Sequence, residues 1–267
     1  MRISSSAACL RGGTSMMCDG RSRAMGMSAL PPLRAQRAIS THAPRISGRR
    51  ISNRHMHPEI LEPKTTAAFT LLGAQPLMHI EKGVYLVGGT ALALQFGHRE
   101  SVDLDFVCEQ GFPTNFRETL SSLGIVTVVR DEENTFDGTF NDVKISMFAF
   151  RYPRLFPTLA YEGIALADAR DIAAMKILAV TQRAARKDFV DLYMLIKQYG
   201  LPMLLDLFER KYAGATFSRT HLLKSISYFA DAEADPMPRM HVSLNWEEIK
   251  QTLEKEAHAM ITASRAN

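Results

Sequence analysis

The sequence predicts an α/β (α+β) protein in which a small mixed sheet flanked by helices is followed by a helical C-terminal part. Two observations support this prediction. Over residues 56–165 short β-rich segments alternate with helical segments, whereas after residue 166 the apolar residues follow helical spacing alone. We therefore expect an α/β core over 56–165 and a helical region over 166–267.

Residues 1–55 differ from the rest of the chain in composition. They hold ten arginines, no lysine and one acid, so they carry +9, whereas the remaining 22 basic and 27 acidic side chains carry −5. The segment has no hydrophobic period, which predicts a disordered basic extension or a mis-assigned start, with Met56 as the alternative first residue. Its Arg-rich, acid-poor composition is also typical of an organellar transit peptide. A basic arm that binds RNA is a further alternative, although the segment has no aromatic residue to stack on bases.

Composition also bounds the environment of the protein. No apolar run approaches the ~20 residues that span a bilayer, so we expect no membrane partner. The three cysteines, Cys9, Cys18 and Cys108, have no metal-ligand spacing, and two of them lie in the first 55 residues. This pattern favours a reducing, cytoplasmic compartment without disulfides.

The expected elements follow from apolar periodicity and from glycine and proline punctuation. In the core we expect, in chain order, a helix within 58–72, a strand at 84–87, a Gly-Gly-Thr turn at 88–90, a helix at 91–96, a polar loop at 98–101, a strand at 102–107, a helix at 115–123 and strands at 125–130, 135–140 and 143–150. In the helical region we expect helices at 172–183, 188–199, 203–212, 219–229 and 246–261, the first with Asp168 as its N-cap.

The stretch from Gly88 to Asp105 holds the residues that suggest chemistry. Asp103 and Asp105 are two apart in a predicted strand, which places them on one face with Cα atoms roughly 6.5 Å apart, where they could share a hard cation. Gly88 and Gly89 allow the backbone to approach a ligand, and the following helix offers free N–H groups to phosphate. Each pattern alone also fits an ordinary turn or a solvated strand face. Together they predict a metal site beside a phosphate site.

These residues resemble a known superfamily. Gly88-Gly89-Thr90 followed by Asp103-Leu104-Asp105 is similar to the signature of the DNA polymerase β-type nucleotidyltransferases. The wider segments GGTALALQFGHRESVDLDF and DIAAMKILAVTQRAARKDFVDLYMLI resemble the AbiEii-type nucleotidyltransferases of bacterial toxin–antitoxin and phage-defence systems. The resemblance covers roughly residues 77–235.

The resemblance implies an enzyme that moves an NMP from an NTP to a hydroxyl acceptor on RNA, such as tRNA, or on protein. It implies that Asp103 and Asp105 hold Mg²⁺, with Mn²⁺ as a substitute, and that Gly88, Gly89 and Thr90 hold phosphates. It also implies a cognate antitoxin protein as a partner.

A second motif of the resemblance maps onto Lys176, Arg183, Asp188 and Asp191. Lys176 and Arg183 would contact the triphosphate, and Asp188 or Asp191 would orient Lys176 or the acceptor. The residue types alone also fit a different interpretation, in which Lys176 extends to water, Asp188 is a helix N-cap and the other cations form a solvated helix end. Lys176, Arg183, Arg186 and Lys187 are the expected contacts if RNA is the acceptor.

One departure from the superfamily pattern concerns the third metal carboxylate. Lys144 and Ser146 occupy mid-strand positions where many members place an acid, and Asp142 stands only at the strand start. Either Asp142 reaches the site, or Asp188 or Asp191 replaces it, or the second metal is held weakly. His98, in the polar loop, is a further candidate ligand or base.

Two other functions are open at this stage. Asp103-Leu104-Asp105-Phe106-Val107 fits the nucleophile motif of haloacid-dehalogenase-type phosphatases, although Gly-Gly-Thr stands upstream. The missing mid-strand carboxylate also suggests a catalytically degenerate fold that acts as a nucleotide, RNA or protein binding module.

Overall fold

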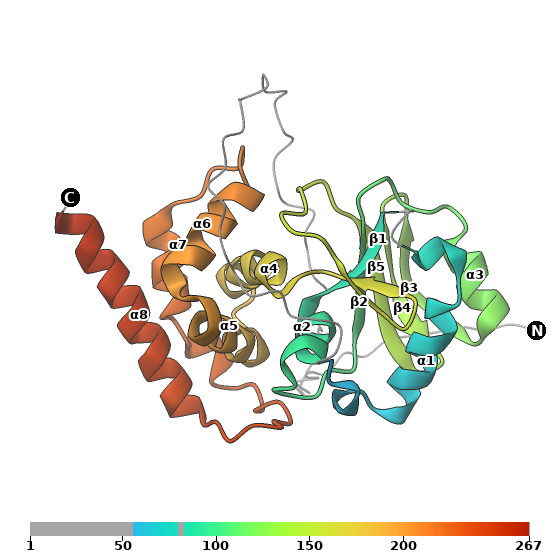
Figure 1. Ribbon diagram of the computed structural model, residues 1–267, viewed down its shortest axis with the longest axis horizontal. Coiled ribbons are helices and arrows are strands. Elements are labelled where there is room, and N and C mark those ends of the chain that lie inside the picture. Colours follow the sequence, from blue (N-terminus) through green and yellow to red (C-terminus); the bar gives the residue numbers. More distant parts are fainter. Residues whose placement is uncertain (1–55, 80–82, 267) are drawn as a thin grey trace, which may run out of the picture. The chain divides into compact units, whose positions relative to one another are not determined.

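The computed structural model describes residues 56–79 and 83–266 (Figure 1). The predictions for residues 1–55 lie outside the described residues, and so do Cys9 and Cys18. Within the described ranges, no helix is long and apolar enough to cross a bilayer.

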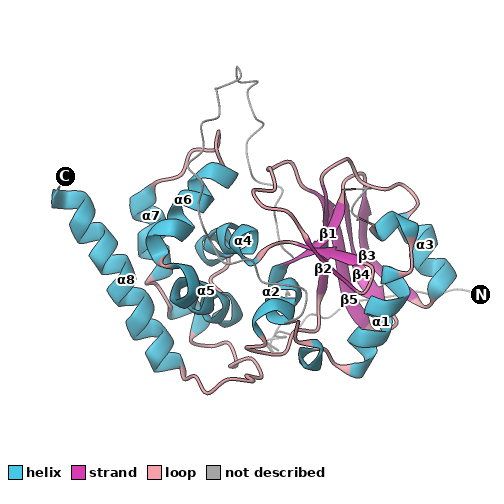
Figure 2. Cartoon of the chain, viewed as in Figure 1, coloured by secondary structure: helices cyan, strands magenta, loops and turns pink. Residues whose placement is uncertain are grey.

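A mixed sheet forms the centre of the α/β part (Figure 2). Its strands are β1 (Val84–Val87), β2 (Leu104–Cys108), β3 (Val126–Glu132), β4 (Thr135–Phe140), β5 (Val143–Ala149), β6 (Leu159–Tyr161) and β7 (Ile164–Leu166). Their order across the sheet is β3-β4-β5-β2-β1-β7-β6. β1 pairs antiparallel with β2, which pairs parallel with β5, so the strand that carries Asp105 lies between β1 and β5.

Helices accompany the sheet, and further helices follow it in the chain. They are α1 (Pro63–Gly73), α2 (Gly88–Phe96), α3 (Phe116–Leu123), α4 (Ala169–Gln182), α5 (Arg186–Tyr199), α6 (Leu201–Lys211), α7 (Arg219–Ile226) and α8 (Trp246–Ala266). α2 contacts β1 and β2 as well as α4 and α5, and Figure 1 shows it between the sheet and the later helices. Its residues from Thr90 to Gln95 are all buried, which a short helix enclosed on every side requires. α2 therefore connects the sheet to the helical region.

The predicted mixed α/β fold class is confirmed, with differences at several elements. Gly88, Gly89 and Thr90 form the first turn of α2 rather than a turn before it. β2 begins at Leu104, and Val102 is exposed, so the expected buried alternation does not extend to residue 102. β6 and β7 were not predicted, because each is only three residues long; β7 pairs with the distant strand β1, and β6 pairs with β7. The last strand ends at Leu166 and the described elements after it are helical, but the division into domains at 165 stays a prediction.

Candidate active site

The N-terminus of α2 lies at the end of β1 and carries no capping side chain. Its N-cap, Val87, makes no side-chain hydrogen bond to the helix. The first N–H groups of such a helix lack intrahelical acceptors, and the helix dipole adds positive charge there. This end of α2 is therefore chemically suited to an anion such as a phosphate.

Close packing explains both glycines of this turn. Gly88 has φ +72°, and a Cβ atom there would lie 2.9 Å from Asp105 Oδ2. A Cβ atom on Gly89 would lie 2.4 Å from Arg99 Nη2. The positive φ of Gly88 favours glycine, and a side chain at Gly89 would require the Arg99 guanidinium to move, whether or not a phosphate binds. Phosphate binding by Gly88, Gly89 and Thr90 stays a proposal.

The side chain of Thr90 is directed away from the place where a phosphate would bind. It is buried, and its hydroxyl lies 2.8 Å from Ser101 Oγ and within hydrogen-bonding distance of the Asp103 carbonyl oxygen. The hydroxyl therefore anchors the chain just before β2. In this arrangement Thr90 can offer a phosphate its backbone N–H, while its side chain positions Asp103.

The two strand acids have different environments. Asp105 lies opposite Val87 on β1 and Ser146 on β5, and Ser146 Oγ donates a 2.6 Å hydrogen bond to Asp105 Oδ1. Asp103 precedes β2 at the surface, where Lys187 Nζ lies 3.5 Å from its Oδ2. The sheet thus holds Asp105 firmly next to the start of α2, while Asp103 stays accessible.

Asp142 does not reach these acids. It occupies the turn between β4 and β5, with φ +61°, and precedes Ser146 by four residues of an extended strand. Four strand residues span about 13 Å. The suggestion that Asp142 completes the metal site is therefore wrong.

A buried network of charges joins α4, α5 and the loop after α2. Lys176 Nζ lies 2.8 Å from Asp188 Oδ1 and 2.6 Å from Asp191 Oδ2. Arg183 donates to both oxygens of Asp188 at 2.6 and 2.8 Å. Arg99 donates to both oxygens of Asp191 at 2.7 and 2.8 Å. The four residues of the second motif are thus brought together.

The network corrects the interpretation of this motif as ordinary helix surface. Lys176 is buried, so it does not extend to water. Asp188 lies within the first turn of α5 rather than at its N-cap, which is Ala185. A buried carboxylate needs cationic partners, and Lys176 with Arg183 supplies them.

The electrostatics keep both buried acids ionised. Burial alone would raise the pKa of Asp188, but attraction to Lys176 and Arg183 outweighs it and lowers that pKa to about 2. Burial likewise opposes ionisation of Asp191, whose pKa nevertheless lies well below the usual value because of Arg99 and Lys176. Burial would lower the pKa of Lys176, but attraction to Asp188 and Asp191 raises it. Lys176 is therefore a fixed cation held by two fixed anions.

The engagement of Asp188 and Asp191 limits what they can do. Each is fully buried, and each has both oxygens occupied by cationic or imidazole donors. Neither is placed to bind a metal or to contact an acceptor in this arrangement. Orientation of Lys176 is the role that fits their geometry.

The donor set fits Mg²⁺ as an ion shared with a substrate. Among the described residues no group of three or more histidine, cysteine or acidic side chains is placed to hold a metal ion. Asp103 and Asp105 are therefore the oxygen donors to consider. Mg²⁺ is commonly bound through one or two carboxylates together with substrate phosphates and water, so two acids beside the uncapped start of a helix suit it.

Two other candidates differ from expectation. His98 is fully buried, and its Nε2 lies 2.8 Å from Asp191 Oδ1, so it supports the network instead of lining an open loop. Arg186 donates to the Ala232 and Glu233 carbonyl oxygens and stacks on Trp246, so it is not a free RNA contact. Cys108 is buried on β2.

Sequence reasoning missed Arg99. Its loop, residues 98–101, was interpreted as a polar surface loop, yet Arg99 is buried and binds Asp191 on α5. No spacing along the chain indicated it, because Arg99 and its partner are 92 residues apart, and a buried arginine meets its carboxylate only in the folded chain.

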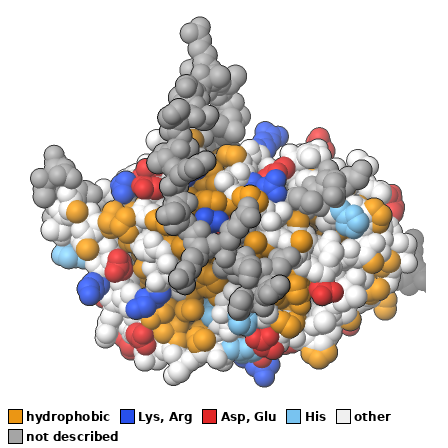
Figure 3. Space-filling model, viewed as in Figure 1, with side chains coloured by type: hydrophobic (Ala, Val, Ile, Leu, Met, Phe, Trp, Pro, Cys, Tyr) orange, Lys and Arg blue, Asp and Glu red, His pale blue; other side chains and the backbone are white. Residues whose placement is uncertain are grey.

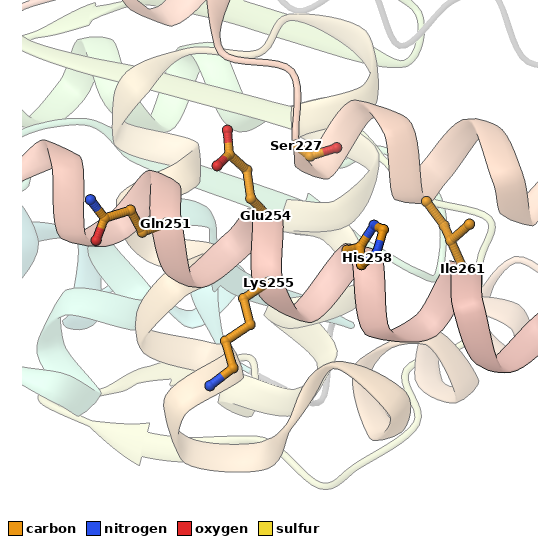
Figure 4. A pocket seen from close by; sticks show the side chains of 6 residues that line it. All are labelled: Ser227, Gln251, Glu254, Lys255, His258 and Ile261. Carbon is orange, nitrogen blue, oxygen red and sulfur yellow. The ribbon is translucent and has the colours of Figure 1, made fainter.

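A separate groove runs along α8. Ser227 and residues of α8 line it, as Figure 4 shows: Gln251, Glu254, Lys255, His258 and Ile261. None of them belongs to the site described above, and the groove has no functional assignment.

Comparison with known proteins identifies the class of the enzyme. The family model described as "Nucleotidyl transferase AbiEii toxin, Type IV TA system" matches residues 71–166 and 136–262. A protein of Aquifex aeolicus (strain VF5), aq_aa25, is 34% identical over 179 residues, which are 64% of this chain and 85% of that relative. The chain is a nucleotidyltransferase.

More particularly, the chain belongs to the AbiEii nucleotidyltransferase toxin family, because the family model matches well over half of it. Two solved structures are similar in part. The nucleotidyltransferase toxin MenT4 of Mycobacterium tuberculosis H37Rv has a TM-score of 0.49 at 16% identity, covering 72% of this chain and 81% of that one. JHP933 of Helicobacter pylori has a TM-score of 0.47 at 19% identity, covering 77% and 98%. Since both scores are below 0.5, the family assignment rests on the sequence match.

Proposed function

We propose that the protein transfers a nucleoside monophosphate from an NTP to a hydroxyl acceptor in a Mg²⁺-dependent reaction, with Mn²⁺ as a substitute. The acceptor is RNA, such as tRNA, or protein. The observation that carries the proposal is the position of Asp105 against Gly88, which puts an ionisable oxygen donor directly beside the uncapped start of α2. A triphosphate at this helix end would have its charge next to both carboxylates.

The residues have distinct roles in the proposed reaction. The N–H groups of Gly88, Gly89 and Thr90 bind the β and γ phosphates at the start of α2. Asp103 and Asp105 would hold the metal, which when bound would neutralise charge on the triphosphate as pyrophosphate leaves. Ser146 fixes Asp105 through its hydrogen bond.

The buried network would contribute positive charge to the proposed triphosphate site. Lys176 is held by Asp188 and Asp191, and Arg183, a third exposed, borders the same cluster. Burial would lower the pKa of Arg183. A hydrogen bond and attraction to Asp188, with attraction to Asp105, outweigh burial and raise that pKa. Attraction between Arg183 and Asp105 supports a role for Arg183 in stabilising a phosphate at the site.

The reaction requires the acceptor oxygen in line with the bond that breaks. The hydroxyl oxygen bonds to the α-phosphorus and gives its proton to water, the bond from the α-phosphorus to the bridging oxygen breaks, and pyrophosphate leaves with the electron pair. Positioning and charge stabilisation account for most of the catalysis in such reactions. Strand β2 and the buried network both hold their side chains in fixed positions, as catalysis by positioning requires.

Family membership supports a toxin role with a cognate antitoxin protein as partner. The surface bears on how RNA would bind. On the face shown in Figure 3, acidic and basic side chains are interspersed without a broad patch of one sign. Residues 56–267 carry 22 basic and 27 acidic side chains, so local cations at the site would recognise an RNA acceptor.

Transfer of radiolabel from each of the four α-labelled NTPs, with Mg²⁺, to total RNA and to total protein tests the proposal. Wild type should label one acceptor pool and release pyrophosphate, whereas Asp103→Ala with Asp105→Ala should not. Asp142→Ala is the matched control, because it removes an exposed carboxylate outside the site. Equal labelling by wild type and the double variant, or none by wild type in any pool, would count against transfer and favour the degenerate binding module.

A further inference from the structure

Lys187 is a cation from the helical region that reaches a proposed metal carboxylate. It lies in the first turn of α5, and its Nζ is 3.5 Å from Asp103 Oδ2. The Lys187 side chain is 45% exposed and that of Asp103 is 26% exposed. The pair therefore lies at the open side of the site, where an incoming substrate would meet it.

The neighbouring cations are committed to other partners. Lys176 and Arg183 bind Asp188, Arg99 binds Asp191, and Arg186 binds backbone carbonyl oxygens. Lys187 differs from them. Among the described residues its recorded partner is Asp103 alone, so this ammonium is available for another anion.

The location of Lys187 is unfavourable for the helix itself. A cation in the first turn interacts badly with the positive end of the helix dipole. Its exposed ion pair with Asp103 offers little compensation, because such pairs contribute between nothing and about 1 kcal/mol. A lysine that stabilises neither its helix nor a strong ion pair is better explained by a ligand.

The chemistry of the pair indicates which ligand. A divalent cation at Asp103 would repel the ammonium and satisfy the carboxylate in its place. The flexible four-carbon stem of lysine lets its point charge follow a phosphate. The triphosphate proposed for this site would arrive with the metal.

We propose that Lys187 is a further nucleotide-binding residue that occupies the cation position at Asp103 in the empty site and moves to a phosphate of the NTP when metal and nucleotide bind. This inference rests on the proposed function. The metal and Lys187 would then compete for Asp103, whereas Lys187 would bind the nucleotide.

Two binding measurements on the full chain test both halves of the proposal without relying on turnover. The variants are Lys187→Gln, Lys187→Arg and, as a matched control on the same helix, Lys197→Gln. Mn²⁺ binding without nucleotide is measured by electron paramagnetic resonance. Binding of ATP, CTP, GTP and UTP is measured by equilibrium dialysis with Mg²⁺, at two salt concentrations.

Lys187→Gln should bind Mn²⁺ about two- to fivefold more tightly than wild type, because an ion pair that competes for Asp103 is lost. The same variant should bind the preferred NTP roughly tenfold more weakly and with a shallower salt dependence, because a charge-assisted phosphate contact is lost. Lys187→Arg should stay near wild type in nucleotide binding. Lys197→Gln should match wild type in both measurements.

The outcomes separate this inference from the function beneath it. Wild-type binding of Mn²⁺ and an NTP, with unchanged affinities in Lys187→Gln, would overturn the role of Lys187 alone. Weaker Mn²⁺ binding by Lys187→Gln would also overturn it, since that result would make Lys187 a support for Asp103. Failure of wild type to bind Mn²⁺ or any NTP would overturn the proposed function as well.

Discussion

Arg99 and Asp191 form a two-point ion pair between the loop after α2 and helix α5, with Nε 2.7 Å from Oδ1 and Nη2 2.8 Å from Oδ2. Both side chains are buried. Because Arg99 Nη2 also occupies the space that a side chain on Gly89 would need, one guanidinium links the start of α2 to the network that holds Lys176. The uncapped start of α2 and the buried lysine are thus held in one arrangement.

Replacement of Arg99 by Met should lower the free energy of unfolding by about 3–5 kcal/mol, because Asp191 would keep its charge in a buried position with one partner fewer. Urea denaturation followed by circular dichroism measures this loss. Arg117→Met is the control, since Arg117 pairs with Asp131 at the surface and should contribute at most about 1 kcal/mol. Equal losses for the two variants would show that burial of the Arg99 pair is energetically unimportant.

Replacement of Gly89 by Ala should reduce nucleotidyl transfer although alanine favours helix formation. The added Cβ atom would lie 2.4 Å from Arg99 Nη2, so the guanidinium must move and loosen its hold on Asp191. Stability and transfer rate would both be measured.

A double-variant cycle identifies the cause of the Gly89 effect. Lysine at position 99 has no branched guanidinium, so Gly89→Ala should cost less in the Arg99→Lys background than in wild type. Strictly additive effects of the two changes would contradict the steric explanation and favour a direct backbone role for Gly89.

Replacement of Ser146 by Ala should lower stability by about 1 kcal/mol, the usual contribution of a hydrogen bond, and should lower the transfer rate by roughly tenfold because Asp105 loses its fixed orientation. The measurements are urea unfolding and initial rates at saturating NTP. Ser122→Ala removes a comparable hydroxyl on α3, whose Oγ donates to Thr119 O, and serves as control. A transfer rate unchanged by Ser146→Ala would remove Ser146 from the site.

Acid should destabilise the protein through its buried carboxylates. The pKa of Asp188 is lowered to about 2, so the unfolded chain takes up a proton at this residue before the folded chain does. The resulting stability is fully present above the unfolded pKa of about 4 and is lost as pH falls toward about 2. Asp191, whose pKa is also lowered, acts in the same direction.

Urea unfolding at several pH values between about 5 and about 2.5 measures this dependence. Asp188→Asn should be less stable than wild type at neutral pH and should lose less on acidification. Asp142→Asn should keep the wild-type slope, because Asp142 is exposed in a turn. A wild-type slope in Asp188→Asn would mean that other carboxylates cause the acid sensitivity.

Local patterns predicted much of this protein. The apolar alternation of residues 135–140 and the glycine stop at Gly97 depend on neighbours in sequence, so β4 and the end of α2 were found at or near their observed bounds. The Gly-Gly-Thr and Asp-x-Asp motifs likewise indicated the nucleotidyltransferase class, which the family match confirms. The roles of individual residues in catalysis stay proposals.

The sequence by itself indicated the class of enzyme through motifs that match its family, and it located the elements that carry Gly88 and Asp105, because helix and strand periods and turn chemistry are local properties. Only the tertiary structure decided the partners of the charges. That Lys176 is buried between two carboxylates, that Arg99 completes them, and that Ser146 holds Asp105 all depend on distant segments packing together. A buried charge is stable only beside its counter-charge, and that neighbour is set by the fold rather than by spacing along the chain.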